Sequence, residues 1–186
     1  EEWIYDLGEH ALALGLADRR IGEEFVKSAV RLHRVEPAEK VLNRALERGP
    51  AAAVYIARAL LYWNSDRAAL ALESLEAASK LAVRAARAYL LGAAIQSAAG
   101  DLPPTRKLMG RALVLNPRDP EALGLAAEAE LKDGRLEPAF RLSEGALGID
   151  PGESRAMEVR ALALAQLGRV AEARNAFLRL VAAAPE

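Results

Sequence analysis

The sequence contains no cysteine, few aromatic residues and no long uninterrupted apolar run. Without cysteine the chain has no disulfide, no thiolate ligand for zinc and no cysteine nucleophile. No apolar run approaches the ~18 residues that a membrane span needs, so we expect no direct membrane insertion. These absences do not assign a compartment. We favour the cytoplasm, with the periplasm as the alternative if a signal or anchor has been removed.

Groups that carry chemistry are also scarce. The chain has two histidines, His10 and His33, which are far apart and do not make a metal site. No Ser/His/Asp arrangement can be nominated, and no glycine-rich loop has the spacing that cradles phosphate. Acidic and basic residues nearly balance, at a formal net charge of -1, which argues against a nucleic-acid partner. We therefore expect no catalytic residues, no metal, no cofactor and no nucleic acid.

What the chain does contain is alanine, leucine and valine. Apolar residues make up 52% of the sequence while aromatic residues make up only 5%. Because alanine and leucine favour helices and aromatic runs are rare, this composition predicts closely packed helices.

Small residues recur at one fixed interval of 34 residues, for example from Ala59 to Ala93. Five sequence columns follow this interval: Ala59, Ala93, Ala127, Ala161; Asp66, Gly100, Gly134, Gly168; Ala71, Thr105, Ala139, Ala173; Ala78, Ala112, Ala146, Leu180; and Val83, Pro117, Pro151, Pro185. A period of this length indicates a helical solenoid. It divides the chain into four units, at 52–85, 86–119, 120–153 and 154–186.

Each unit is expected to contain two helices. In the third unit Asp119 is a good N-cap and Pro120 a good first helical residue. Gly134 ends this helix because glycine adopts the left-handed C-terminal turn, and Pro138 begins the second helix. Short turns make neighbouring helices antiparallel. The fold class is therefore all-α.

The pattern of Leu123, Ala127, Gly134, Ala139 and Ala146 followed by Asp150-Pro151 resembles the tetratricopeptide repeat (TPR). The resemblance implies a right-handed α-solenoid of antiparallel helix pairs, the TPR superhelix, with about 11 helices in a single domain over 1–186. Four residues depart from the family pattern: Asp66 at the turn, Thr105 at a small position, and Arg58 and Arg160 at apolar positions.

The N-terminal segment follows the pattern less well. Residues 19–51 are interpreted as a degenerate repeat and residues 1–18 as an orphan N-terminal helix, the second helix of a missing pair. Alternatively, this segment is the first helix of a TPR hairpin, whose pattern would be formed by Ile4, Leu7, Gly8, Ala11 and Gly15.

In the TPR family the first helices of the hairpins line a concave groove in which partners bind. Carried over to this chain, the groove consists of Ile56, Leu60, Trp63, Asn64, Arg87, Leu90, Glu121, Glu128, Arg155 and Glu158. It is apolar over 52–98 and charged over 121–158, which suits an amphipathic helix or an extended peptide. Leu60 and Trp63 are the candidate anchors, unless Trp63 only fills space between helices. The basic cluster of carboxylate-binding TPR proteins is absent.

The resemblance implies a non-catalytic protein–protein interaction scaffold of bacterial type that binds a peptide or a helix. The alternative is a recruiting or regulatory arm of a larger enzyme or polysaccharide-export assembly, with the catalytic part outside this chain. The chain starts at Glu1 rather than at methionine, so we expect a fragment or a processed form. Because no polar helix caps the last repeat, either the natural chain continues or the face of Phe177, Leu180 and Val181 mediates self-association.

Overall fold

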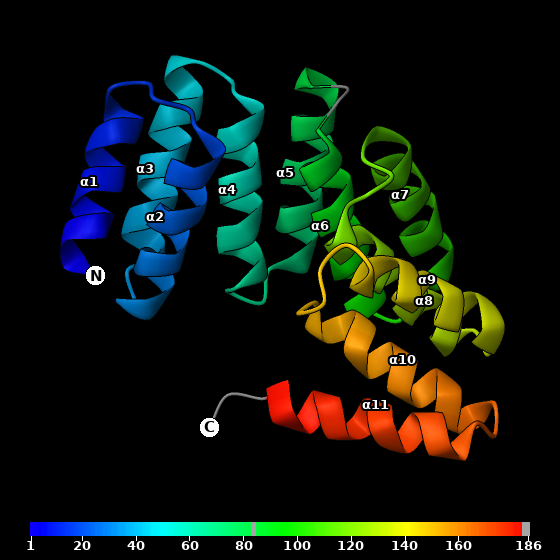
Figure 1. Ribbon diagram of the computed structural model, residues 1–186. Helices are drawn as coiled ribbons and strands as arrows, with labels where there is room; N and C mark the ends of the chain where they lie inside the picture. Colours follow the sequence, from blue (N-terminus) through cyan, green and yellow to red (C-terminus); the bar gives the residue numbers. More distant parts are fainter. Residues whose placement is uncertain (83–84, 184–186) are drawn as a thin grey trace. The chain divides into compact units, whose positions relative to one another are not determined.

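The computed structural model describes residues 1–82 and 85–183 and has an all-α fold. Over these residues it contains 11 helices and no strand, and 79% of the described residues are helical. The helices are α1 (Glu2–Ala13), α2 (Arg19–Arg31), α3 (Val35–Arg48), α4 (Ala52–Trp63), α5 (Ala68–Leu81), α6 (Ala86–Ala98), α7 (Leu102–Leu115), α8 (Pro120–Lys132), α9 (Leu136–Leu147), α10 (Ser154–Gln166) and α11 (Val170–Ala183) (Figure 1). The predicted all-α class and the number of helices are confirmed. Val83 and Pro185, which were expected to end two of the repeats, lie outside the described residues.

The chain forms two compact units, Glu1–Ile95 and Gln96–Glu186. The boundary falls within α6, between Ile95 and Gln96. Each unit has its own apolar core.

In the first unit α1 packs against α2 and α3, both α2 and α3 pack against α4, and α4 packs against α5. Phe25, Leu42 and Leu61 are completely buried at the centre of the core that α1 to α4 share. The ring of Tyr5 lies 4.9 Å from that of Phe25. A second cluster joins α4 and α5 to the part of α6 that belongs to this unit.

In the second unit α8 packs against α7, α9 and α10, and α10 packs against α9 and α11. The direct contact between α8 and α10 parallels the contact between α2 and α4 in the first unit. First helices of successive repeats are therefore neighbours in both units, and their shared face is the surface on which the resemblance expects a partner.

The recurring small residues lie where helices approach closely. Ala59, Ala93, Ala127 and Ala161 are all at most 1% exposed. Two glycines of the first unit have the same role, because a Cβ atom on Gly8 or Gly22 would lie 2.9 Å from the Cβ atom of Phe25 or Ala57. Larger side chains would overpack these crossings.

The first helices end in one type of turn. A residue with positive φ follows each of them, and the next amide donates a hydrogen bond back into the helix, for example from Arg67 N to Tyr62 O at 2.9 Å. The positive-φ residues are Gly15, His33, Asp66, Gly100, Gly134 and Gly168. The same type of turn follows α1 at Gly15 and α2 at His33.

The arginines that depart from the family pattern connect helices. Arg58 donates hydrogen bonds to Asn43 Oδ1 on α3 at 3.1 Å and to Ser74 Oγ on α5 at 3.2 Å. Its guanidinium group also lies 5.0 Å from the centre of the Tyr55 ring. Arg160 of α10 pairs with Glu144 of α9. Each arginine thus satisfies its polar head while its half-buried stem packs between helices.

Candidate partner-binding surface

A pocket of about 370 Å³ opens on the face of the first helices in the first unit. We call it the α2–α4–α6 pocket. It is lined by Glu23, Val26, Lys27, Val30, Arg31, Leu60, Asn64 and Arg87. Its size lies at the lower end of the range for ligand sites in proteins. Three of the predicted groove residues, Leu60, Asn64 and Arg87, therefore share one concave site.

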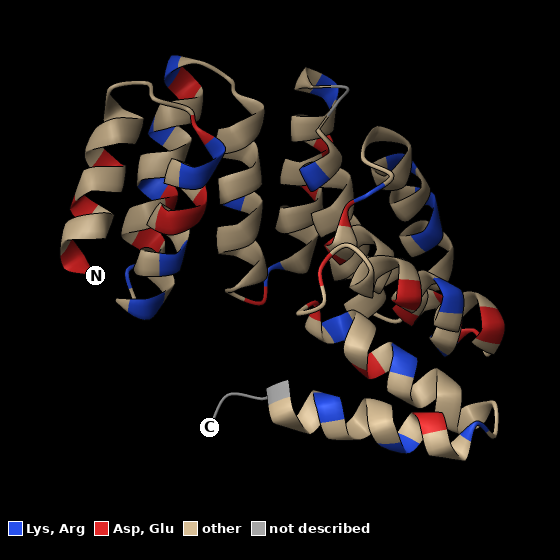
Figure 2. Ribbon diagram, in the orientation of Figure 1, with Lys and Arg blue, Asp and Glu red and all other residues tan. Residues whose placement is uncertain are grey.

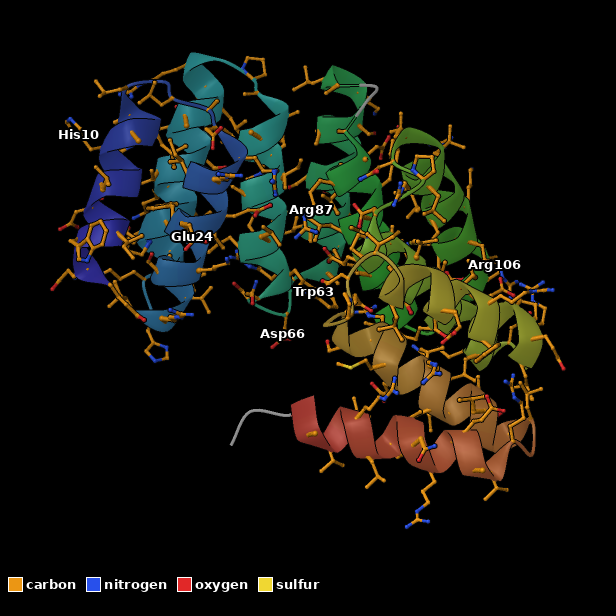
Figure 3. All side chains as sticks on the ribbon, viewed as in Figure 1. His10, Glu24, Trp63, Asp66, Arg87 and Arg106 are labelled. Carbon is orange, nitrogen blue, oxygen red and sulfur yellow. The ribbon has the colours of Figure 1, made fainter. Side chains whose placement is uncertain are left out.

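Trp63 lies beside this pocket, close to the C-terminal end of α4 and to the turn at Asp66 (Figure 3). It is 36% exposed and lines a small apolar cleft of about 20 Å³ together with Leu60, Leu91 and other side chains of α4, α5 and α6. Most of the indole is therefore packed, and a substantial part remains available to a partner.

Two of the predicted groove residues are buried. Ile56 is 5% exposed and Leu90 is 2% exposed. Ile56 belongs to the cluster that joins α4, α5 and α6. Both side chains are packed inside the first unit and therefore offer a partner almost no area.

The pocket includes residues of α2 that the repeat pattern did not predict. Glu23, Lys27 and Arg31 lie one turn apart along this helix, and Val26 and Val30 lie beside them. The segment lacks the recurring small residues, so no groove positions were carried over to it. The helical spacing of charged and apolar residues on α2 was the one signal in the sequence that could have predicted its place in the pocket.

The charged region of the second unit is internally paired. Glu128 of α8 forms ion pairs with Arg155 Nη1 of α10 at 2.8 Å and with Lys132 Nζ at 2.6 Å. Lys132 Nζ also donates to the carbonyl oxygen of Ser97 at 3.3 Å. Figure 2 shows acidic and basic residues interspersed on α10. Glu121 and Glu158 are exposed. The predicted residues Glu128 and Arg155 are thus brought together, and a partner would compete with their mutual attraction.

A further carboxylate that sequence analysis missed lies where α8 meets the start of α10. The Glu153 side chain accepts a hydrogen bond from the Ala156 backbone amide and caps α10. Gly124 of α8 leaves the room that this carboxylate occupies. Burial raises the pKa of Glu153, and the Ala156 hydrogen bond and the charge of Arg155 oppose that rise. The arrangement is that of a structural cap.

Over residues 1–82 and 85–183, no three histidine, aspartate or glutamate side chains gather in a way that could hold a metal ion. No helix in the same part of the chain is long and apolar enough to span a bilayer. His10 is exposed on α1, and His33 is exposed in the turn that follows α2.

The paired helices, the small residues at their crossings and the left-handed turns define a TPR-type helical fold. Solved structures of TPR proteins are similar to it. A crystal structure of MamA aligns with a TM-score of 0.72 and 19% identity over 85% of this chain and 93% of that one. Pseudomonas aeruginosa pilF aligns with a TM-score of 0.78 and 18% identity over 98% of this chain and 79% of that one. Yeast Tom70 aligns with a TM-score of 0.78 and 19% identity over 98% of this chain, which spans 39% of that protein. At these identities the likeness shows the fold alone.

No protein-family model matches the sequence, and no curated protein matches it.

Proposed function

We propose that the chain is a non-catalytic protein-interaction scaffold that binds a peptide or a helix on the face of its first helices. TPR-type folds serve in general as scaffolds of this kind. The observation that carries the proposal is the α2–α4–α6 pocket, which is concave, has an apolar floor and is open to solvent. A preformed concave surface favours a ligand segment that inserts a side chain.

The anchor of the interaction is the exposed edge of Trp63 together with Leu60. These two side chains are adjacent in the small apolar cleft next to the pocket. A partly exposed tryptophan on a rigid helix is a strong candidate for an interface hot spot, because its large area is already held in place. Glu128 and Arg155 of the second unit are already paired with each other, so we expect them to contribute less to binding than Trp63 and Leu60.

The experiment uses a peptide selected from a random display library on the immobilised chain. The affinity of that peptide is then measured for the parent, for Trp63→Ala and for Trp3→Ala. Trp3 is the other tryptophan of the chain, is 68% exposed on α1 and does not line the pocket. We expect Trp63→Ala to weaken binding by about tenfold or more and Trp3→Ala to leave it unchanged.

The unfolding midpoint in urea is measured for the same three proteins. Unchanged affinity together with a lowered midpoint for Trp63→Ala would assign this residue to packing alone and reject it as the anchor. The alternative is a recruiting or regulatory arm of a larger enzyme or polysaccharide-export assembly, whose catalytic part lies outside this chain. The flanking coding sequence distinguishes that role from a freestanding scaffold.

A further inference from the structure

The rim of the α2–α4–α6 pocket carries three basic side chains, Lys27, Arg31 and Arg87, and one acidic side chain, Glu23. Glu23 is already paired, with Arg19 Nη1 at 3.0 Å and with Arg87 Nε at 3.5 Å. The residues that line the pocket therefore carry more positive than negative charge, although the net charge of the chain is -1. We propose that it selects an acidic peptide segment, with an apolar side chain in the pocket and aspartate or glutamate side chains on Lys27 and Arg31. This inference rests on the proposed function and specifies its ligand.

The present partners of Lys27 and Arg31 are weakly held. Lys27 Nζ pairs with Glu24 at 2.7 Å, and the two side chains are 58% and 56% exposed. Arg31 Nη1 pairs with Glu1 at 2.9 Å, and these side chains are 65% and 47% exposed. Because exposed ion pairs contribute little net free energy, a carboxylate on a ligand can replace Glu24 or Glu1 at small cost.

The floor of the pocket supplies the apolar part of the recognition. Val30 and Leu60 are only partly buried and supply the apolar area that a ligand side chain can cover, whereas Val26 is 2% exposed and supports them from within the core. These side chains are fixed by packing between α2 and α4, so burying a ligand side chain on them requires little new ordering. The basic side chains above the floor then favour acidic neighbours of that apolar residue.

The spacing of the basic residues favours side-chain carboxylates over a chain terminus. Lys27 and Arg31 lie one helical turn apart on α2. Two carboxylates one turn apart on a ligand can engage both, whereas the single carboxylate at a peptide end cannot match this spacing as well. An acidic amphipathic segment is therefore the ligand that the pocket fits.

The test uses three synthetic peptides of identical apolar sequence, with glutamate, glutamine or lysine at the flanking positions. Their affinities for the whole chain are measured by fluorescence anisotropy at low and at high salt. We expect the glutamate peptide to bind about fivefold to tenfold more tightly than the glutamine peptide, and the lysine peptide to bind least tightly. The preference should shrink as the salt concentration rises. Amidating the C-terminus of the glutamate peptide should change nothing.

Charge reversal in the protein provides the matched comparison. The double variant Lys27→Glu, Arg31→Glu should reverse the order of the three peptides. The double variant Lys40→Glu, Lys80→Glu changes the net charge equally at exposed positions on α3 and α5 that do not line the pocket, and should keep the order. An unchanged order in the pocket variant would overturn the proposal, as would loss of binding on amidation. Equal binding of all three peptides, with Trp63→Ala still weakening it, would overturn the acidic preference and leave the scaffold function standing.

Discussion

At the scale of single residues, the left-handed turns after the first helices show how backbone strain, rather than packing, affects stability. Four of the positive-φ residues in the described chain are glycine, whereas His33 and Asp66 are not. Asp66 has a φ of 58°, and Gly134, at the same place in its own repeat, has a φ of 73°. A Cβ atom added at Gly134 would have no heavy atom within 4 Å, so only backbone strain distinguishes the two residue types at this turn.

We expect Asp66→Gly to raise the free energy of unfolding by about 0.5–1 kcal/mol, since glycine adopts the left-handed conformation without the strain of a Cβ atom. Gly134→Asp, the matched exchange, should lower it by about 1 kcal/mol. Urea unfolding followed by circular dichroism measures both values. A lower stability of Asp66→Gly would show that the aspartate side chain makes a stabilising contact that outweighs the strain.

At the scale of helices, a carboxylate joins α3 to the end of α4. Glu39 accepts hydrogen bonds from the Tyr62 hydroxyl at 2.9 Å and from Arg67 Nη1 at 2.8 Å. The guanidinium group of Arg67 also lies 4.5 Å from the centre of the Tyr62 ring. Burial acts to raise the pKa of Glu39, but the hydrogen bonds from Arg67 and Tyr62 and the charges of Arg67 and Arg58 outweigh it, so the pKa is lowered.

The lowered pKa makes this connection dependent on pH. A carboxyl group whose pKa is lower in the folded than in the unfolded chain stabilises the fold above its unfolded pKa, and this stabilisation is lost as the pH falls through the folded pKa. We expect Glu39→Gln to lower the free energy of unfolding by about 1–2 kcal/mol at neutral pH. The difference from the parent should begin to shrink as the pH falls below the ordinary pKa of glutamate, and it should disappear as the pH passes through the lowered pKa of Glu39.

The measurement is urea unfolding of both proteins at neutral and at acidic pH. Glu36→Gln is the matched control, because Glu36 is exposed on the same helix, and it should have little effect at either pH. A difference between Glu39→Gln and the parent that stays constant with pH would contradict the role given to the ionised carboxylate.

The helices themselves could be predicted from the sequence because their determinants are local. The caps, the turn glycines and the recurring alanines each act within one hairpin, so a fixed interval reveals them. The partners of Arg58 and Glu39 could not be predicted, since they come from three different helices and depend on how those helices cross. The pocket was only partly predicted for the same reason: Leu60, Asn64 and Arg87 follow the repeat, whereas Lys27 and Arg31 lie on a helix that does not.

At the scale of the whole molecule, the second unit exposes an apolar face on α11. Phe177, Leu178 and Val181 are 37%, 58% and 72% exposed and lie within about one helical turn. Leu180, which was expected on this face, is half-buried, and Leu178 takes its place. A cluster of this kind favours association, whereas single exposed apolar residues do not. The expected partner is a second copy of the chain, because every copy presents the same face.

Light scattering over a range of concentrations measures this association. We expect the average mass to rise above the 19.9 kDa of a single chain as the concentration increases. Leu178→Glu with Val181→Glu should return it to that of the single chain. Val114→Glu changes an isolated valine of α7 that is 81% exposed and should have no effect. A constant mass of one chain at the highest concentration would rule out self-association through α11.

The ion pair between Arg31 and Glu1 connects the pocket to the first turn of α1. If a ligand carboxylate takes Arg31, Glu1 loses that partner, so occupancy of the pocket and attachment of the first turn oppose each other. Such linkage is reciprocal: a change that weakens the ion pair between Glu1 and Arg31 strengthens ligand binding by the same free energy. Ligand binding should therefore speed up amide hydrogen exchange at Ile4 and Tyr5, whose amides donate to the carbonyl oxygen of Glu1.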